Sequence, residues 1–168
     1  MIFVTGGARS GKSTFALQKA SSLAGDAVSF IATAEALDTE MSERIERHKL
    51  ERNPNWQTLE EALEIELALE RATHNLVVLD CVALWVSNML LVGISEAAML
   101  ERAGAFITSA TRLEKTVIVV SNEVGLGIVP DNALARDYRD ALGRVNQTFA
   151  AASSEAYLLV SGLELRLK

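Results

Sequence analysis

The first thirteen residues constrain the fold more than any other part of the chain. Ile2–Thr5 is a short apolar, β-branched run that is typical of a buried strand. It leads directly into Gly6-Gly-Ala-Arg-Ser-Gly-Lys-Ser13, which has the spacing of a phosphate-binding P-loop. Glycines let backbone N–H groups and a helix N-terminus face phosphate oxygens. We therefore predict a nucleoside triphosphate site, with Lys12 on the β- and γ-phosphates and Ser13 on Mg²⁺.

The length and charge of the chain narrow the class of protein. A chain of 168 residues suits a single domain, 1–168, with a sizeable core. Its net charge of -6 argues against a nucleic-acid-binding surface. Met1 leads straight into the first strand, so we expect no signal peptide, and no apolar stretch is long enough to span a bilayer. The lone Cys81 fits a reducing cytoplasm, and we interpret it as a small buried residue rather than a nucleophile.

Strands alternate with helices along the chain. Further strands are expected at Val28–Thr33, Leu76–Asp80, Val117–Ser121 and Ala156–Val160, and helices at 13–23, 38–52, 84–91, 97–113 and about 131–152. Thr58-Leu-Glu-Glu61 has the pattern of a capping box, which predicts a helix to about Ala72. The alternation predicts an α/β, P-loop NTPase-type three-layer fold with a mostly parallel sheet. Leu163–Leu167 follows the previous strand too closely for a helical crossover, so we expect an antiparallel edge hairpin.

Two strand ends are expected to lie beside the P-loop. In open α/β sheets, ligands bind at the carboxyl ends of the parallel strands. The second strand ends there in Ile31-Ala32-Thr33, and Leu76–Asp80 ends in a carboxylate. A strand-end Asp in this position contributes to the Mg²⁺ shell of P-loop enzymes. Ser13 and Asp80 are therefore the predicted metal ligands.

His48 lies within a highly charged segment, Asp38–Arg52, and two interpretations of it remain open. It belongs either to a solvated helix face, as an incidental residue, or to an active site, as a nucleophile that attacks phosphorus and forms a phosphoramidate. In the second case Arg47 and Lys49 would favour the neutral imidazole and stabilise charge on the phosphoryl oxygens. His74 follows a predicted helix in a turn, where a surface or capping role is expected.

Several blocks of the sequence together resemble a known family. They are Gly6–Ser13, Ile31–Thr33, Arg44-Ile-x-x-His-Lys49, Trp56-x-Thr-x-Glu60, Asn122-Glu-Val-Gly-Leu-Gly-Ile-Val-Pro130, Arg139-Asp140, Gly143-Arg-Val-Asn-Gln147 and Val160–Gly162. In this order they closely resemble the bifunctional adenosylcobinamide kinase / adenosylcobinamide-phosphate guanylyltransferase family, over essentially the whole chain. The first of these blocks, with its Arg-Ser-Gly-Lys-Ser run, and the long block that ends at Pro130 are far more specific than a P-loop alone.

The resemblance implies a role in cobalamin biosynthesis. It implies phosphorylation of adenosylcobinamide with ATP or GTP, then transfer of GMP from GTP to adenosylcobinamide-phosphate, giving adenosylcobinamide-GDP. It also implies Mg²⁺, a homotrimer and a guanylylated histidine at His48. The implied site comprises catalytic His48 and Lys12 and the nucleotide-binding residues Gly6, Gly7, Ala8, Arg9, Ser10, Gly11, Lys12, Ser13, Ile31, Ala32, Thr33, Lys49, Glu60 and Asp80.

Alternatives remain for the function and for one loop. The chain could be a monofunctional small-molecule P-loop kinase in which His48 is inert, or a nucleotide-dependent switch or assembly module. Asn122–Pro130 is either a structural connection or a contact for phosphates or corrinoid. Within it, the Glu123 carboxylate is a candidate for binding a cobinamide amide or acting on the hydroxyl proton.

Overall fold

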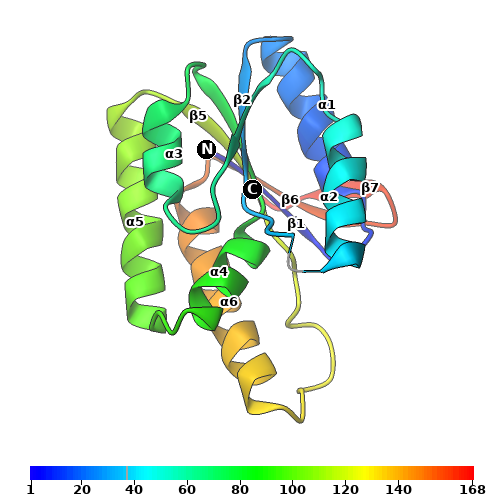
Figure 1. Cartoon of the computed structure of the whole chain (residues 1–168), viewed down its shortest axis with the longest axis vertical. Helices are drawn as coiled ribbons and strands as arrows, with labels where there is room; N and C mark the ends of the chain where they lie inside the picture. The colour runs from blue at the N-terminus through cyan, green and yellow to red at the C-terminus, as the bar shows by residue number, and fades with distance from the viewer. Residues whose placement is uncertain (37) are drawn as a thin grey trace.

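The computed structural model describes residues 1–36 and 38–168, and its centre is a seven-stranded sheet (Figure 1). The strands are β1 Ile2–Gly6, β2 Val28–Ala32, β3 Gln57–Glu60, β4 Leu76–Asp80, β5 Thr116–Val120, β6 Glu155–Val160 and β7 Leu163–Arg166. Their order across the sheet is β3-β2-β4-β5-β1-β6-β7. Every neighbouring pair is parallel except β6 and β7. The mostly parallel sheet with an antiparallel edge hairpin is thus confirmed.

Helices cover both faces of the sheet, which confirms the three-layer architecture. They are α1 Lys12–Ala24, α2 Thr39–Leu50, α3 Ile65–Arg71, α4 Val82–Leu91, α5 Glu96–Arg112 and α6 Ala133–Ala152. α1 packs on β4 and β5 from one side, whereas α3, α4, α5 and α6 pack together on the other side (Figure 1). Within residues 1–36 and 38–168, no helix combines the length and the apolar character needed to cross a membrane.

The two helical layers are packed differently. α1 approaches the sheet through Ala16 and Ala20, both fully buried, and small side chains permit this close contact. On the opposite face the rings of Trp85, Phe106 and Phe149 fill the space between α4, α5 and α6, with Phe149 edge-on to the other two at centroid distances of 6.5 and 6.0 Å. Together these layers hold the carboxyl ends of the central strands in fixed positions.

The prediction of a helix from Thr58 was wrong. Gln57–Glu60 forms β3, which pairs in parallel with β2 and places every second side chain, Thr58 and Glu60, in solvent. The helix begins only at Ile65. The Glu61 carboxylate accepts hydrogen bonds from the N–H groups of the two residues ahead of this helix, at 3.3 and 3.1 Å. Glu61 therefore closes the turn into α3, and Thr58 caps nothing.

Candidate active site

The P-loop connects β1 to α1 in a tightly packed turn. A Cβ atom at Gly6 would lie 2.5 Å from the carbonyl oxygen of Leu159 and 2.6 Å from Ser10 Oγ, so only glycine fits there. The Lys12 ammonium donates a hydrogen bond of 3.2 Å to the carbonyl oxygen of Gly7. This contact curls the lysine side chain back over the loop, and Lys12 also lines the adjoining pocket at the N-terminus of α1.

Two distant segments brace the P-loop. Gly162, in the turn between β6 and β7, donates its N–H to the carbonyl oxygen of Ser10 at 2.9 Å. The backbone of Gly162 also lies so close to Gly11 that a Cβ atom on Gly11 would sit 3.2 Å from it. On the other side, the N–H of Glu123 donates to the carbonyl oxygen of Gly6 at 3.1 Å. The loop is thereby fixed by backbone contacts from the last third of the chain.

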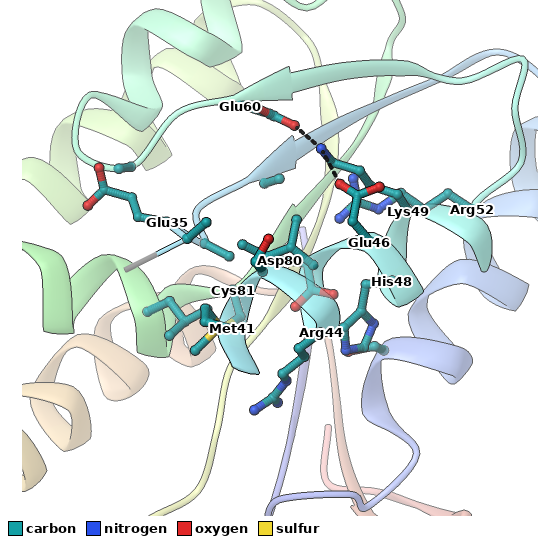
Figure 2. Close-up of a pocket in the computed structure, with 18 of the residues that line it drawn as sticks. Glu35, Met41, Arg44, Glu46, His48, Lys49, Arg52, Glu60, Asp80 and Cys81 are labelled. Carbon is teal, nitrogen blue, oxygen red and sulfur yellow. Dashed lines mark ion pairs between the residues drawn. The ribbon is translucent and has the colours of Figure 1, made fainter. Parts of the chain in front are cut away.

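Beside the P-loop, the strand ends frame a pocket of about 560 Å³. In the sheet register Ala32 pairs with both Glu60 and Asp80, so β2, β3 and β4 end side by side. The α2 helix forms the opposite wall (Figure 2). The predicted site residues that line this pocket are Lys12, Ser13, Ala32, His48, Lys49, Glu60 and Asp80.

Asp80 lies half-buried at the end of β4. Burial raises the pKa of its carboxyl group, while a hydrogen bond with Ser13 and the positive charge of Lys12 act against that rise. Ser13 and Asp80 therefore place a hydroxyl and a carboxylate oxygen together at the helix N-terminus. Mg²⁺ prefers such hard oxygen ligands and uses one or two of them with the substrate phosphates, so these two side chains fit the ion.

Lys12 and Cys81 are buried next to Asp80. Burial lowers the pKa of the Lys12 ammonium, and the carboxylate of Asp80 opposes this change. A phosphate at the loop would act in the same direction as the carboxylate and favour the charged lysine. Burial raises the pKa of Cys81 to about 12, so its thiol is protonated at neutral pH. The interpretation of Cys81 as a small buried residue is confirmed.

α2 is held over the pocket by charged side chains, because it buries none of its own residues. Lys49 Nζ lies 2.9 Å from a carboxylate oxygen of Glu60 on β3 and 3.2 Å from one of Glu46 on α2 (Figure 2). Just past the helix, the Arg52 guanidinium stacks 3.9 Å above the ring of Phe30 on β2. These contacts anchor the carboxyl-terminal turn of α2 to the edge of the sheet.

His48 lies on the face of α2 that lines the pocket, with its side chain 37% exposed. Figure 2 shows His48 and Arg44 projecting from the same side of the helix, as their spacing of four residues requires. The His48 Nδ1 atom is 3.3 Å from a carboxylate oxygen of Glu51. A carboxylate at Nδ1 favours the tautomer with its proton there, which leaves the Nε2 lone pair available for chemistry.

Two predicted residues lie behind the pocket instead of in its wall. The Thr33 hydroxyl donates to the carbonyl oxygen of Cys81 and accepts from the N–H of the same residue, both at 2.8 Å. Ile31 and Thr33 are both fully buried. Their geometry positions the end of β2, so that Ala32 is the member of this block that reaches the cavity.

Arg44 and Arg52 also line the pocket, and sequence reasoning did not select them. The Nη1 atom of Arg52 is buried without a hydrogen-bond partner in the described part of the chain. An unpaired buried donor of this kind is available to a ligand oxygen. The signal that could have identified Arg44 is its four-residue spacing from His48, which places both on one face of α2. Arg52 follows the end of α2, and its position depends on its stacking on Phe30, which no local pattern shows.

Comparison with known proteins identifies relatives of this chain over its whole length. The sequence model of the family described as "Cobinamide kinase / cobinamide phosphate guanyltransferase" matches residues 2–167. The chain is 40% identical to the "Bifunctional adenosylcobalamin biosynthesis protein CobU" of Salmonella typhimurium strain LT2, covering 100% of this chain and 99% of that protein. The "Bifunctional adenosylcobalamin biosynthesis protein CobP" of Pseudomonas aeruginosa is also 40% identical, over 98% and 95% of the two chains.

Solved structures of other proteins share the fold. The flagellar accessory protein FlaH from Methanocaldococcus jannaschii superposes with a TM-score of 0.59 at 14% identity, over 99% of this chain and 77% of that one. A KaiC-like protein from the hyperthermophilic archaeon Pyrococcus horikoshii superposes with a TM-score of 0.52 at 14% identity, over 94% and 69% of the two chains. At these identities the likeness concerns the arrangement of strands and helices alone.

Proposed function

The chain belongs to the cobinamide kinase / cobinamide phosphate guanyltransferase family, and we propose that both of its reactions take place in the pocket under α2, within one domain, with His48 as the covalent nucleophile. The activities are cobinamide kinase and guanylyltransferase in adenosylcobalamin synthesis. Full-length similarity to bifunctional relatives is the observation that carries this assignment. The grouping of His48, Lys12 and Asp80 around one cavity supports the proposed site.

Guanylyl transfer proceeds in two displacements at the α-phosphorus of GTP. The Nε2 lone pair of His48 attacks this phosphorus, a P–N bond forms, and the P–O bond to pyrophosphate breaks. The guanylylated imidazole keeps its Nδ1 proton and carries a positive charge, which the Glu51 carboxylate 3.3 Å away balances. In the second displacement a phosphate oxygen of adenosylcobinamide-phosphate attacks the same phosphorus and the P–N bond breaks. The products are adenosylcobinamide-GDP and free His48.

The kinase reaction uses the same P-loop, but it takes place at a different phosphorus atom of the nucleotide. The aminopropanol hydroxyl oxygen of adenosylcobinamide attacks the γ-phosphorus of ATP or GTP, the bond to the bridging β–γ oxygen breaks, and the hydroxyl proton is released. Lys12 holds the β- and γ-phosphates in both reactions, so it faces the leaving group in each case. Ser13 and Asp80 would hold Mg²⁺, which neutralises phosphate charge when bound.

Two further properties belong to this proposal. We propose a homotrimer, as the family resemblance implies, and the exposed α2 helix, which buries no residue in one chain, suits packing on a neighbouring subunit. We also propose a cytoplasmic location, because ATP and GTP are the substrates. Light scattering of the purified protein tests the first property by its mass relative to the 18.2 kDa chain.

Labelling with GTP tests the nucleophile directly. The purified protein is incubated with Mg²⁺ and GTP that carries the label on its α-phosphate, and then denatured. We expect an acid-labile, base-stable label on the wild type and none on His48→Ala, as a phosphoramidate requires. His74→Ala is the matched control, because His74 is the only other histidine of the chain, and it should label like the wild type.

The outcome separates the two candidate functions. A wild type that binds GTP and phosphorylates adenosylcobinamide but takes up no label is a monofunctional kinase. Label that persists on His48→Ala would assign the nucleophile to a different residue.

A further inference from the structure

A second cavity of about 380 Å³ lies beside the nucleotide pocket. We call it the acceptor cleft and define it by Glu123 on one side and by Arg139, Gly143, Asn146 and Gln147 of α6 on the other. Asn122 lines the nucleotide pocket, and the next residue, Glu123, lines the cleft. The same Glu123 donates its N–H to the P-loop at Gly6. The two cavities are therefore neighbours that share one edge of the sheet.

We propose that the acceptor cleft binds the peripheral amide groups of the corrinoid substrate. This inference rests on the proposed function, since it supplies a place for the acceptor of both reactions. A corrinoid carries many primary amides around its ring, and each amide both donates and accepts hydrogen bonds. The cleft offers the complementary groups. The Glu123 carboxylate is the acceptor, through the oxygen that does not accept from the N–H of Gly125. The Arg139 guanidinium is the donor, and the Gln147 amide is both.

Arg139 differs from the arginines on either side of it in α6. Arg136 donates to the backbone carbonyl oxygens of Pro130 and Asp131, and Arg144 forms an ion pair with Glu96. Arg139 is half-buried, and it has neither a hydrogen bond nor an ion pair with any described residue. Its donors are thus unused by the fold at a position that faces the cleft, which is what a ligand-binding arginine requires.

The floor of the cleft is rigidly connected to the nucleotide site. The Asn146 amide donates to the carbonyl oxygen of Asn122 at 3.0 Å, and its oxygen accepts from the Ser121 hydroxyl at 2.6 Å. Both partners directly follow β5, whose end lies beside Asp80 in the sheet. An acceptor held on α6 would therefore have a fixed orientation relative to the bound triphosphate, and fixed orientation is a large part of catalysis of group transfer.

The loop between Glu123 and α6 offers apolar side chains to the part of the corrinoid outside the cleft. It extends away from the sheet before α6 begins, as the yellow segment of Figure 1 shows. Leu126 and Ile128 in this loop are 87% and 97% exposed. The corrin ring itself is broad and largely apolar between its amides. Its apolar surface could therefore pack against these exposed side chains. A polar cleft with an apolar flank matches this substrate better than it matches a second nucleotide.

Substitutions on α6 test the proposal in the kinase reaction, with adenosylcobinamide as the varied substrate. Arg139→Gln removes the charge and the forked donors. Gly143→Phe obstructs the cleft, because a Cβ at Gly143 would meet no atom within 4 Å and the added ring has room only toward the cavity and solvent. Gly143→Ala is the matched control, and Arg112→Ala on α5 is the control for loss of an arginine outside the cleft.

We expect KM for adenosylcobinamide to rise at least about tenfold in Arg139→Gln and Gly143→Phe, since a hydrogen bond to a charged group contributes roughly this factor or more. KM for ATP and the labelling of His48 by GTP, which needs no acceptor, should match the wild type. Both controls should retain the wild-type KM. Equilibrium dialysis with cobinamide, followed by its visible absorption, should show the same loss of binding. Should Gly143→Phe fail to fold, Arg139→Gln at the surface of α6 remains the decisive variant.

Three results would overturn the inference. An unchanged KM for adenosylcobinamide in Arg139→Gln would show that the acceptor binds elsewhere. A raised KM for ATP with an unchanged one for adenosylcobinamide would assign the cleft to nucleotide phosphates. A rise in Gly143→Ala equal to that in Gly143→Phe would indicate a general change in α6. Failure of the proposed function is distinct from all three, because it would abolish labelling or turnover in the wild type itself.

Discussion

The P-loop and the α2 helix face each other across one pocket, yet they are built in opposite ways. The P-loop connects a fully buried strand to a helix that packs on the sheet, and backbone hydrogen bonds from two other loops hold it. α2 has no buried residue, and it is anchored by the ion pair of Lys49 with Glu60 and by the stacking of Arg52 on Phe30. The P-loop, which would hold the phosphates, is part of the core, whereas His48, the proposed nucleophile, lies on a surface helix.

This difference indicates how a substitution in each region affects the stability of the fold and the function of the site. A substitution in the P-loop alters packing, backbone geometry and phosphate binding together. A substitution on α2 removes exposed or half-exposed contacts, and such changes usually alter stability by no more than about 0.5 kcal/mol. Binding and stability should therefore be coupled at the P-loop and separable at α2. The following variants test this contrast.

Replacement of Lys12 should give the largest change in activity. Lys12→Ala removes the cation from the phosphates in both reactions, so kinase and guanylyltransferase rates should each fall roughly 100- to 1000-fold. Separate assays of the two reactions measure this, and Lys12→Arg is the control that keeps the charge. Kinase activity retained in Lys12→Ala would mean that the two reactions do not both use the P-loop.

Replacement of Gly6 should give the largest change in stability. Gly6→Ala forces a methyl group against the Leu159 carbonyl oxygen, which should lower the free energy of unfolding by roughly 1–3 kcal/mol. A Cβ at Gly7 would meet no atom within 4 Å, so Gly7→Ala is a matched control in the same loop. Urea unfolding compares the two. Equal stability of the two variants would contradict the tight packing described for β1.

Replacement of Glu51 should change the chemistry of His48 with little change in stability. Glu51→Ala removes the carboxylate 3.3 Å from Nδ1, so the imidazole should populate both tautomers and the rate of labelling by GTP should fall a few-fold. Because an exposed pair contributes at most about 1 kcal/mol, the melting temperature should change little. Imidazole ¹⁵N spectra report the tautomer directly, and the chain has only two histidines. Glu43→Ala, elsewhere on α2, is the control.

Loss of the ion pair between Lys49 and Glu60 should have the smallest effect, a small change in thermal stability that depends on pH. Hydrogen bonds with Glu60 and then Glu46 raise the pKa of Lys49 above its ordinary value of 10.5. Its contribution to stability is thus complete below pH 10.5 and is lost as the pH rises through the higher pKa of the folded state. Thermal unfolding should separate the wild type from Glu60→Gln slightly at about pH 8, and the difference should shrink above pH 10.5. A constant difference would exclude this pair as its source.

The central part of the fold could be predicted from local sequence, and the edge strand could not. The P-loop motif, the apolar runs and the short final loop determine β1, β4, β5 and the β6–β7 hairpin. Thr58–Glu61 was misassigned because a Thr and a Glu three residues apart match a capping box equally well. Pairing with β2 decided the outcome, together with Gln57, whose side-chain oxygen accepts from the Ser29 hydroxyl at 2.6 Å. Neither of these contacts is visible in a local pattern.

The candidate site divides in the same way. Lys12, Ser13 and Asp80 could be placed together because a motif and the rule for parallel strand ends locate them. His48 could be selected only by resemblance, since its position over the pocket depends on where α2 is anchored. That anchor includes Arg52 on Phe30, a contact between residues far apart in the sequence whose energy no local pattern expresses.

The central position of β1 also has a consequence for the synthesis of the chain. β1 lies between β5 and β6, and the turn at Gly162 supports the P-loop that follows β1. On a ribosome β1 therefore emerges long before β5, β6 and Gly162 do. During translation the P-loop is made before the strands that flank β1. It gains its backbone contact with Gly162 only after the β6–β7 hairpin has emerged. The β6–β7 turn that supports the P-loop is therefore made well after the P-loop itself.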